Sequence, residues 1–134
     1  MTSPSRRRQV FRVLLVERDQ HALDELRELL DGRRFEAEVA LSVETGEEIL
    51  AERRMDAVIV NGAMDAFPRG GVPALIRRLK EMDGGMKVVI FNGVARKSAQ
   101  RRMRRLGADG YLGKGGDLKD VQRSVFRVLG LDGG

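Results

Sequence analysis

Five short apolar runs alternate along the chain with five segments whose apolar residues recur at helical spacing. Continuous runs rich in Val, Ile and Leu are typical of strands buried on both faces of a parallel sheet, whereas spacings of three and four residues are typical of amphipathic helices. We expect strands at residues 10–16, 35–41, 57–60, 88–91 and 111–112. Their alternation with helices predicts an α/β fold: a doubly wound, five-stranded parallel sheet with helices on both faces.

Polar residues at the expected helix ends support this order of elements. Asp19 or a neighbour can cap the first helix, and Gly32 can close it. Thr45 followed by Glu48 has the spacing of a capping box, so Thr45 is expected to cap a second helix that follows it. Asp117 is expected to cap the last helix.

The length of 134 residues predicts a single domain. We expect a flexible basic tail at 1–9, a globular domain at 10–130 and a C-terminal tail at 131–134. The absence of cysteine excludes disulfides, thiolate metal sites and thiol nucleophiles. No apolar run approaches the roughly 18 residues that cross a bilayer, so no membrane contact is expected. His21, the single histidine, is expected to be a surface residue rather than a catalyst or metal ligand.

Polar residues follow the predicted strands where ligands of such sheets usually bind. These residues are Glu17, Arg18, Asn61, Asn92 and Lys114. The segments around these residues are similar to those of a known protein family. Over about 10–129, and most clearly in the segments 14–19, 56–61 and 107–114, the chain resembles the receiver domain of bacterial two-component response regulators. The resemblance implies a flavodoxin-like strand order of 2-1-3-4-5, a cytoplasmic location and a role in signal transduction.

Only part of the family's phosphorylation site is present in the sequence. Glu17 matches the first acidic residue, and Lys114 matches the lysine. Arg18 replaces the second acidic residue, Asn61 the phosphate-accepting aspartate, and Asn92 the Thr or Ser. An amide is a poor nucleophile and gives no acyl phosphate, so we expect a pseudo-receiver that is not an enzyme. Magnesium binding is expected to be lost or weak, and the Arg18 guanidinium or the Lys114 ammonium is expected to pair with Glu17 instead.

Tyr111 matches the aromatic residue whose rotamer changes on phosphorylation in the family. Asn92 lacks the hydroxyl that the resemblance implies for this coupling. Two interpretations stay open: packing locks one rotamer of Tyr111, or a partner selects it.

The predicted fourth helix has four arginines on its polar side: Arg101, Arg102, Arg104 and Arg105. The resemblance implies protein contacts through this helix, the last strand and the last helix. We therefore expect a signalling or motility protein as partner, an acidic one if the arginines make the contact. The alternatives are a merely solvated face, or nucleic acid bound through the same helix. Homodimerisation, the completeness of the chain and a natural or engineered origin of Asn61 stay open.

Overall fold

The computed structural model describes residues 10–30, 34–64 and 67–131. The predicted N-terminal tail, Gly32 and most of the predicted C-terminal tail lie outside these residues.

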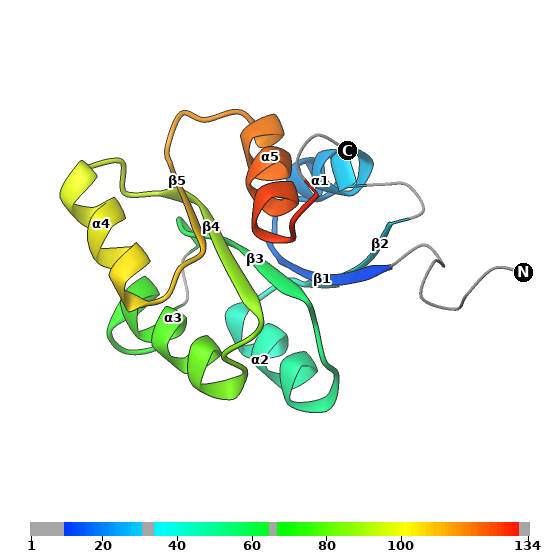
Figure 1. The fold of residues 1–134 in the computed structure, drawn as a ribbon, viewed down its shortest axis with the longest axis horizontal. Helices are drawn as coiled ribbons and strands as arrows, with labels where there is room; N and C mark the ends of the chain where they lie inside the picture. The colour runs from blue at the N-terminus through cyan, green and yellow to red at the C-terminus, as the bar shows by residue number, and fades with distance from the viewer. Residues whose placement is uncertain (1–9, 31–33, 65–66, 132–134) are drawn as a thin grey trace, which may run out of the picture.

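Within the described residues, five strands alternate with five helices (Figure 1). The strands are β1 (Phe11–Val16), β2 (Phe35–Ala40), β3 (Ala57–Asn61), β4 (Lys87–Gly93) and β5 (Gly110–Gly113). The helices are α1 (Gln20–Leu30), α2 (Val43–Glu52), α3 (Gly71–Met82), α4 (Lys97–Leu106) and α5 (Leu118–Val128). All strands are parallel, in the order β2-β1-β3-β4-β5, so the predicted fold class and strand order are confirmed.

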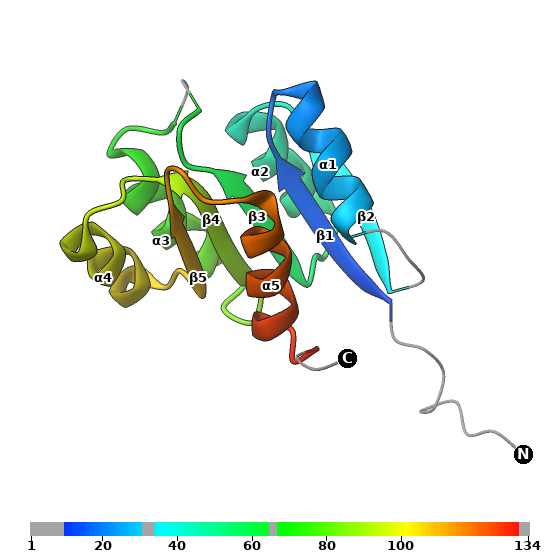
Figure 2. The same ribbon diagram turned by 90° about the horizontal axis from the view of Figure 1, so that it is seen from above.

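The sheet is covered on both faces, by α1 and α5 on one side and by α2, α3 and α4 on the other (Figures 1 and 2). Two hydrophobic cores result. One joins α1 to α5 through residues such as Leu26 and Val125, and the other joins the remaining helices through Val43, Ile76 and Met103.

The central position of β1 explains its apolar sequence. Val13 and Leu15 point into the core beneath α1 and α5, and Leu14 and Val16 point into the opposite core, all at most 3% exposed. Because successive side chains of a strand alternate between faces, a strand covered on both sides has no polar face. β2 lies at the edge of the sheet, and of its residues only Ala40 is fully buried.

The predicted caps of the first and last helices are confirmed. The Asp19 carboxylate accepts the main-chain N–H of Ala22 at 2.9 Å. Asp117 forms a capping box with Asp120 at the start of α5. His21 is exposed in the first turn of α1, as expected.

The predicted start of α2 was wrong. The helix begins at Val43, and the cap is Ser42, whose hydroxyl accepts the main-chain N–H of Thr45 at 3.0 Å. Ser42 and Thr45 can both cap a helix, so local sequence does not choose between them. The earlier start buries Val43 and Gly46 in the first turn. A Cβ at Gly46 would lie 3.2 Å from the Val16 side chain, which shows how closely α2 approaches β1.

No helix within the described residues is long and apolar enough to cross a membrane.

Candidate functional site

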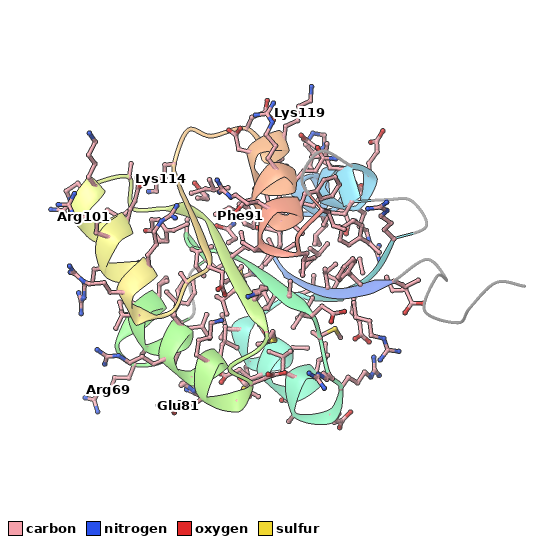
Figure 3. All side chains as sticks on the ribbon, in the orientation of Figure 1. Arg69, Glu81, Phe91, Arg101, Lys114 and Lys119 are labelled. Atoms are coloured by element: carbon pink, nitrogen blue, oxygen red, sulfur yellow. The ribbon has the colours of Figure 1, made fainter. Side chains whose placement is uncertain are left out.

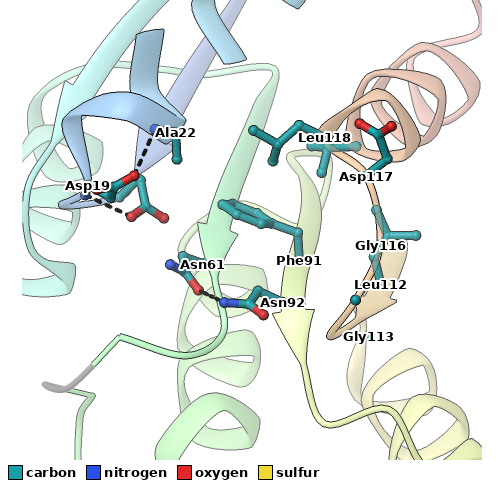
Figure 4. Close-up of a pocket in the computed structure, with 13 residues that line it drawn as sticks. Asp19, Ala22, Asn61, Phe91, Asn92, Leu112, Gly113, Gly116, Asp117 and Leu118 are labelled. Carbon is teal, nitrogen blue, oxygen red and sulfur yellow. Dashed lines mark hydrogen bonds between the residues drawn. The ribbon is translucent and has the colours of Figure 1, made fainter. Parts of the chain in front are cut away.

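A cleft of about 350 Å³ lies at the carboxyl end of the sheet (Figure 4). It is bounded by the start of α1, the ends of β3 and β4, and the loop from β5 to α5. Parallel strands place their carboxyl ends at one edge, so the side chains that follow them meet there. Glu17, Asn61 and Asn92 all line the cleft, and the ring of Phe91 lies between α1 and α5 (Figure 4).

Glu17 is the most buried polar residue of the cleft, with 2% of its surface exposed. Its Oε1 atom accepts two main-chain N–H groups, from Arg18 at 3.1 Å and from Asp19 at 2.8 Å. Its Oε2 atom is buried without a hydrogen-bond partner in the described part of the chain. Glu17 therefore organises the loop after β1 with one oxygen and leaves the other unsatisfied.

The amide of Asn61 is engaged by its neighbours. Its Oδ1 atom accepts the main-chain N–H of Ala63 at 2.8 Å and the side-chain amide of Asn92 at 3.3 Å (Figure 4). The first bond shapes the turn after β3, because an Asn side chain readily accepts a main-chain N–H two residues further on. The second bond joins the ends of β3 and β4.

Asn92 has a left-handed backbone conformation, with φ of 56°, and is the only non-glycine residue with positive φ in the described residues. It lies at a register shift, where Ile90 pairs with Tyr111 but Gly93 pairs with Gly113. Between these two pairs β4 has two residues, Phe91 and Asn92, where β5 has only Leu112. The extra residue in β4 is a β-bulge. Sequence reasoning missed this bulge, although the Asn92–Gly93 dipeptide is a known signal for positive φ.

Neither Arg18 nor Lys114 is among the described residues that line the cleft. Lys114 is exposed and is held through its main-chain N–H, which donates to the Gly93 carbonyl at 2.9 Å. Its ammonium forms no ion pair with a carboxylate in the described ranges, so the expected pairing of Lys114 with Glu17 is not present. The Glu17 hydrogen bonds come instead from the main chain, including that of Arg18.

The cleft does not fit the magnesium ion that the resemblance implies. No three Asp, Glu, His or Cys side chains are grouped as a metal site within the described residues. The Oδ1 atom of Asn61 and the Oε1 atom of Glu17 each already accept two N–H groups. Because magnesium requires oxygen ligands at near-octahedral geometry, these residues are a poor coordination set.

Residues 13–126 match the sequence model of the response regulator receiver domain. The chain belongs to this family. No curated protein sequence matches it significantly.

Solved receiver structures have the same fold. A CheY-like receiver domain protein from Methanospirillum hungatei JF-1 aligns with a TM-score of 0.76 and 20% identity, over 91% of this chain and 95% of that chain. An orphan response regulator of H. pylori aligns with a TM-score of 0.76 and 24% identity, over 91% and 98%. A response regulator from Thermotoga maritima aligns with a TM-score of 0.77 and 20% identity, over 90% and 98%. At these identities the likeness establishes the fold alone.

Tyr111 of this receiver domain points inward and is 4% exposed. Its hydroxyl donates to the Val94 carbonyl at 3.1 Å. Its ring lies directly against Gly93, where a Cβ atom would come within 2.4 Å of the hydroxyl oxygen. Of the two interpretations of Tyr111, the structure favours locking by packing, because the missing side chain at Gly93 creates the space that the ring fills.

Burial raises the pKa of the Tyr111 hydroxyl above its usual 10.0. The unfolded chain therefore loses this proton at lower pH than the folded chain, so the contribution to stability is complete below pH 10.0 and is lost as the pH rises through the folded pKa. The chain has one tyrosine and no tryptophan, so tyrosinate absorbance reports on Tyr111 alone. We expect a titration midpoint above 10.0 in buffer and an ordinary one in denaturant. A midpoint in buffer at or below the ordinary value would contradict the buried rotamer.

The outward face of α4 in this receiver domain is uniformly basic. Of the helix residues only Met103 is fully buried, and Arg101 extends outward from the helix (Figure 3). Six cations are exposed on or just before α4, and none forms an ion pair with a carboxylate in the described ranges: Arg96, Lys97, Arg101, Arg102, Arg104 and Arg105. Because α4 itself contains no acidic residue, this charge is not neutralised within the helix.

Proposed function

We propose that this receiver domain signals without phosphorylation, by binding a protein partner. The observation that carries the proposal is the state of Asn61. The resemblance implies a phosphate-accepting aspartate at this position, where this chain has an amide whose oxygen accepts N–H groups from Ala63 and Asn92. An amide neither attacks phosphorus readily nor forms an acyl phosphate, so no phosphoryl transfer is assigned to the chain.

The surroundings of Asn61 support the same proposal. Phosphoryl transfer to a carboxylate relies on cations that neutralise the phosphate oxygens, magnesium foremost. The described residues of the cleft include no set of carboxylates that fits magnesium, and Lys114 is not among its lining residues. Three residues differ from the family pattern: Asn61 in place of the phosphate acceptor, Arg18 in place of a metal-binding carboxylate, and Asn92 in place of the hydroxyl residue.

We place the contact with the partner on the face formed by α4, β5 and α5, hereafter the α4 face. The resemblance implies contacts there, and the six exposed cations on or just before α4, which form no ion pair within the described ranges, supply a charge that a partner can neutralise. Like charges three and four residues apart repel by about 0.2–0.5 kcal/mol per pair on a helix, so a carboxylate-rich partner surface gains by relieving this repulsion. The proposed partner is an acidic signalling or motility protein in a bacterial cytoplasm.

The test is incubation of the purified chain with acetyl phosphate and magnesium, followed by intact-mass measurement and tyrosine fluorescence. We expect no phosphoryl adduct and no magnesium-dependent change around Tyr111. Asn61→Asp is the matched variant, because it restores the carboxylate with almost no change in size. An adduct on the unmodified chain would refute the proposal, whereas an adduct on Asn61→Asp alone would show that the acceptor is the missing group.

Nucleic acid is the second candidate partner of the α4 face, and the same exposed cations favour it. A contact with phosphates releases counterions, so the logarithm of the affinity falls steeply with the logarithm of the salt concentration. We expect only weak, sequence-independent binding of a DNA duplex, abolished near physiological salt. Tight binding that persists there and is lost in Arg101→Glu, but not in Arg77→Glu on the exposed side of α3, would favour nucleic acid over a protein partner.

A further inference from the structure

The cleft beside Glu17 has the composition of a small-molecule site. Its volume of about 350 Å³ lies at the low end of the range of roughly 300–1,000 Å³ that is typical of such sites. Part of its wall is apolar and is formed by Phe91, Leu112, Leu118 and Val121. The glycines of the loop from β5 to α5 leave the opening without bulky side chains. A flat or branched apolar group of modest size fits this space.

Among the described residues that line the cleft, every charged one is acidic. Glu17, Asp19 and Asp117 contribute carboxylates, and no lysine or arginine is present among its described lining residues. This is unusual within a chain of net charge +5. Asp19 and Asp117 cap α1 and α5, so the positive ends of these helices partly offset their charge. Glu17 differs in that its Oε2 atom has no hydrogen-bond partner in the described part of the chain.

The Oε2 atom of Glu17 is an independent sign of a ligand. Glu17 lines the cleft with 2% of its surface exposed, and its Oε2 atom is buried with no hydrogen-bond partner in the described part of the chain. A buried polar atom without a partner costs about 1–3 kcal/mol, and more when it is charged. A donor that enters the cleft recovers this cost, and a cationic donor recovers the most.

From these features we propose that the cleft binds an organic cation, with an ammonium or guanidinium group on Glu17 Oε2 and an apolar body on Phe91 and Leu118. A metal ion is disfavoured by the ligand set, and an anion is disfavoured by the three carboxylates. The cation is either a free amine or a lysine or arginine side chain of a bound protein. The proposal goes beyond the α4 face and does not depend on it.

Calorimetric titration of the full chain with 2-phenylethylamine tests the proposal. We expect saturable 1:1 binding, and at least about tenfold weaker binding of the neutral 2-phenylethanol and the anionic 3-phenylpropanoate, because each loses the charge-assisted hydrogen bond. A short peptide ending in phenylalanyl-arginine amide separates the two sources. Tighter binding of the peptide indicates a protein side chain, and tighter binding of the amine indicates a free ligand.

Two test variants, each with a matched control, distinguish a loss of binding from a folding defect. Glu17→Gln retains an oxygen for the two main-chain N–H groups but removes the charge, and we expect at least about a tenfold loss of amine affinity. Glu48→Gln, at an exposed position of α2, is the matched control. Ala22→Leu fills the cleft without changing charge and should also abolish binding, whereas Ala51→Leu on the exposed side of α2 should not.

The proposal would be overturned if the amine and the alcohol bind equally, or if neither the amine nor the peptide binds to the folded chain. It would also be overturned if both Glu17→Gln and Ala22→Leu bind the amine as well as the unmodified chain does. Circular dichroism and thermal unfolding establish that each variant is folded before it is titrated.

Discussion

Gly93→Ala should expel the Tyr111 ring from its buried position and lower the free energy of unfolding by about 1–3 kcal/mol, the usual cost of overpacking. The added Cβ would lie 2.4 Å from the tyrosine hydroxyl oxygen and 2.6 Å from the ring atom that carries it. Neither distance is tolerable, and the ring is the only part of this contact that can rotate away. Thermal and denaturant unfolding measure the loss of stability, and tyrosine fluorescence measures the exposure of the ring.

A double-mutant cycle with Tyr111→Ala isolates this steric effect. Removing the ring creates a cavity, so Tyr111→Ala is itself destabilising, but Gly93→Ala should cost little in that background. Gly84→Ala is the control for the glycine substitution, because a Cβ there would meet nothing closer than 3.8 Å. An unchanged stability and an unchanged tyrosine signal in Gly93→Ala would show that Tyr111 is not locked by this contact.

Asn92→Thr should lower the free energy of unfolding by about 1–3 kcal/mol, even though it introduces the hydroxyl that the family resemblance implies at this position. The cause is the backbone, since φ at Asn92 is 56°. Asparagine tolerates this conformation, whereas a β-branched residue is a genuine outlier there. The variant also loses the hydrogen bond from Asn92 to Asn61. Chemical denaturation is the appropriate measurement.

Asn92→Gly separates backbone strain from the lost hydrogen bond. Glycine accepts positive φ without strain but cannot bond to Asn61, so we expect a much smaller loss of stability than in Asn92→Thr. Equal losses in the two variants would assign the effect to the hydrogen bond and not to φ. If strain dominates, a hydroxyl at this position is compatible with the fold only after the bulge in β4 is removed.

The bulge also explains why position-by-position comparison with the family was incomplete. When only the residue types are compared with the family pattern, Asn92 is a replacement of Thr or Ser that loses a hydroxyl. In the structure the residue has a second role, because its positive φ turns β4 and brings Gly93 beneath Tyr111. The loss of the hydroxyl, the bulge and the buried tyrosine therefore form one arrangement at the end of β4.

Much of the candidate site could be predicted because it depends on strand ends. Glu17 and Asn61 follow or end central parallel strands, so any sheet of this order brings them to one edge. Lys114 also follows a strand, yet its long side chain extends into solvent and not into the cleft. The direction of a flexible side chain depends on partners from other elements, and no local pattern specifies those partners.

The sequence by itself determined the order of strands and helices, the burial of β1 on both faces and the residue types at the carboxyl edge, because apolar periodicity is a local property of the chain. Only the tertiary structure decided the start of α2, the left-handed Asn92, the packing of Tyr111 on Gly93 and the unpartnered oxygen of Glu17. Each of these depends on contacts between residues distant in sequence, where packing chooses among conformations that the local sequence permits equally.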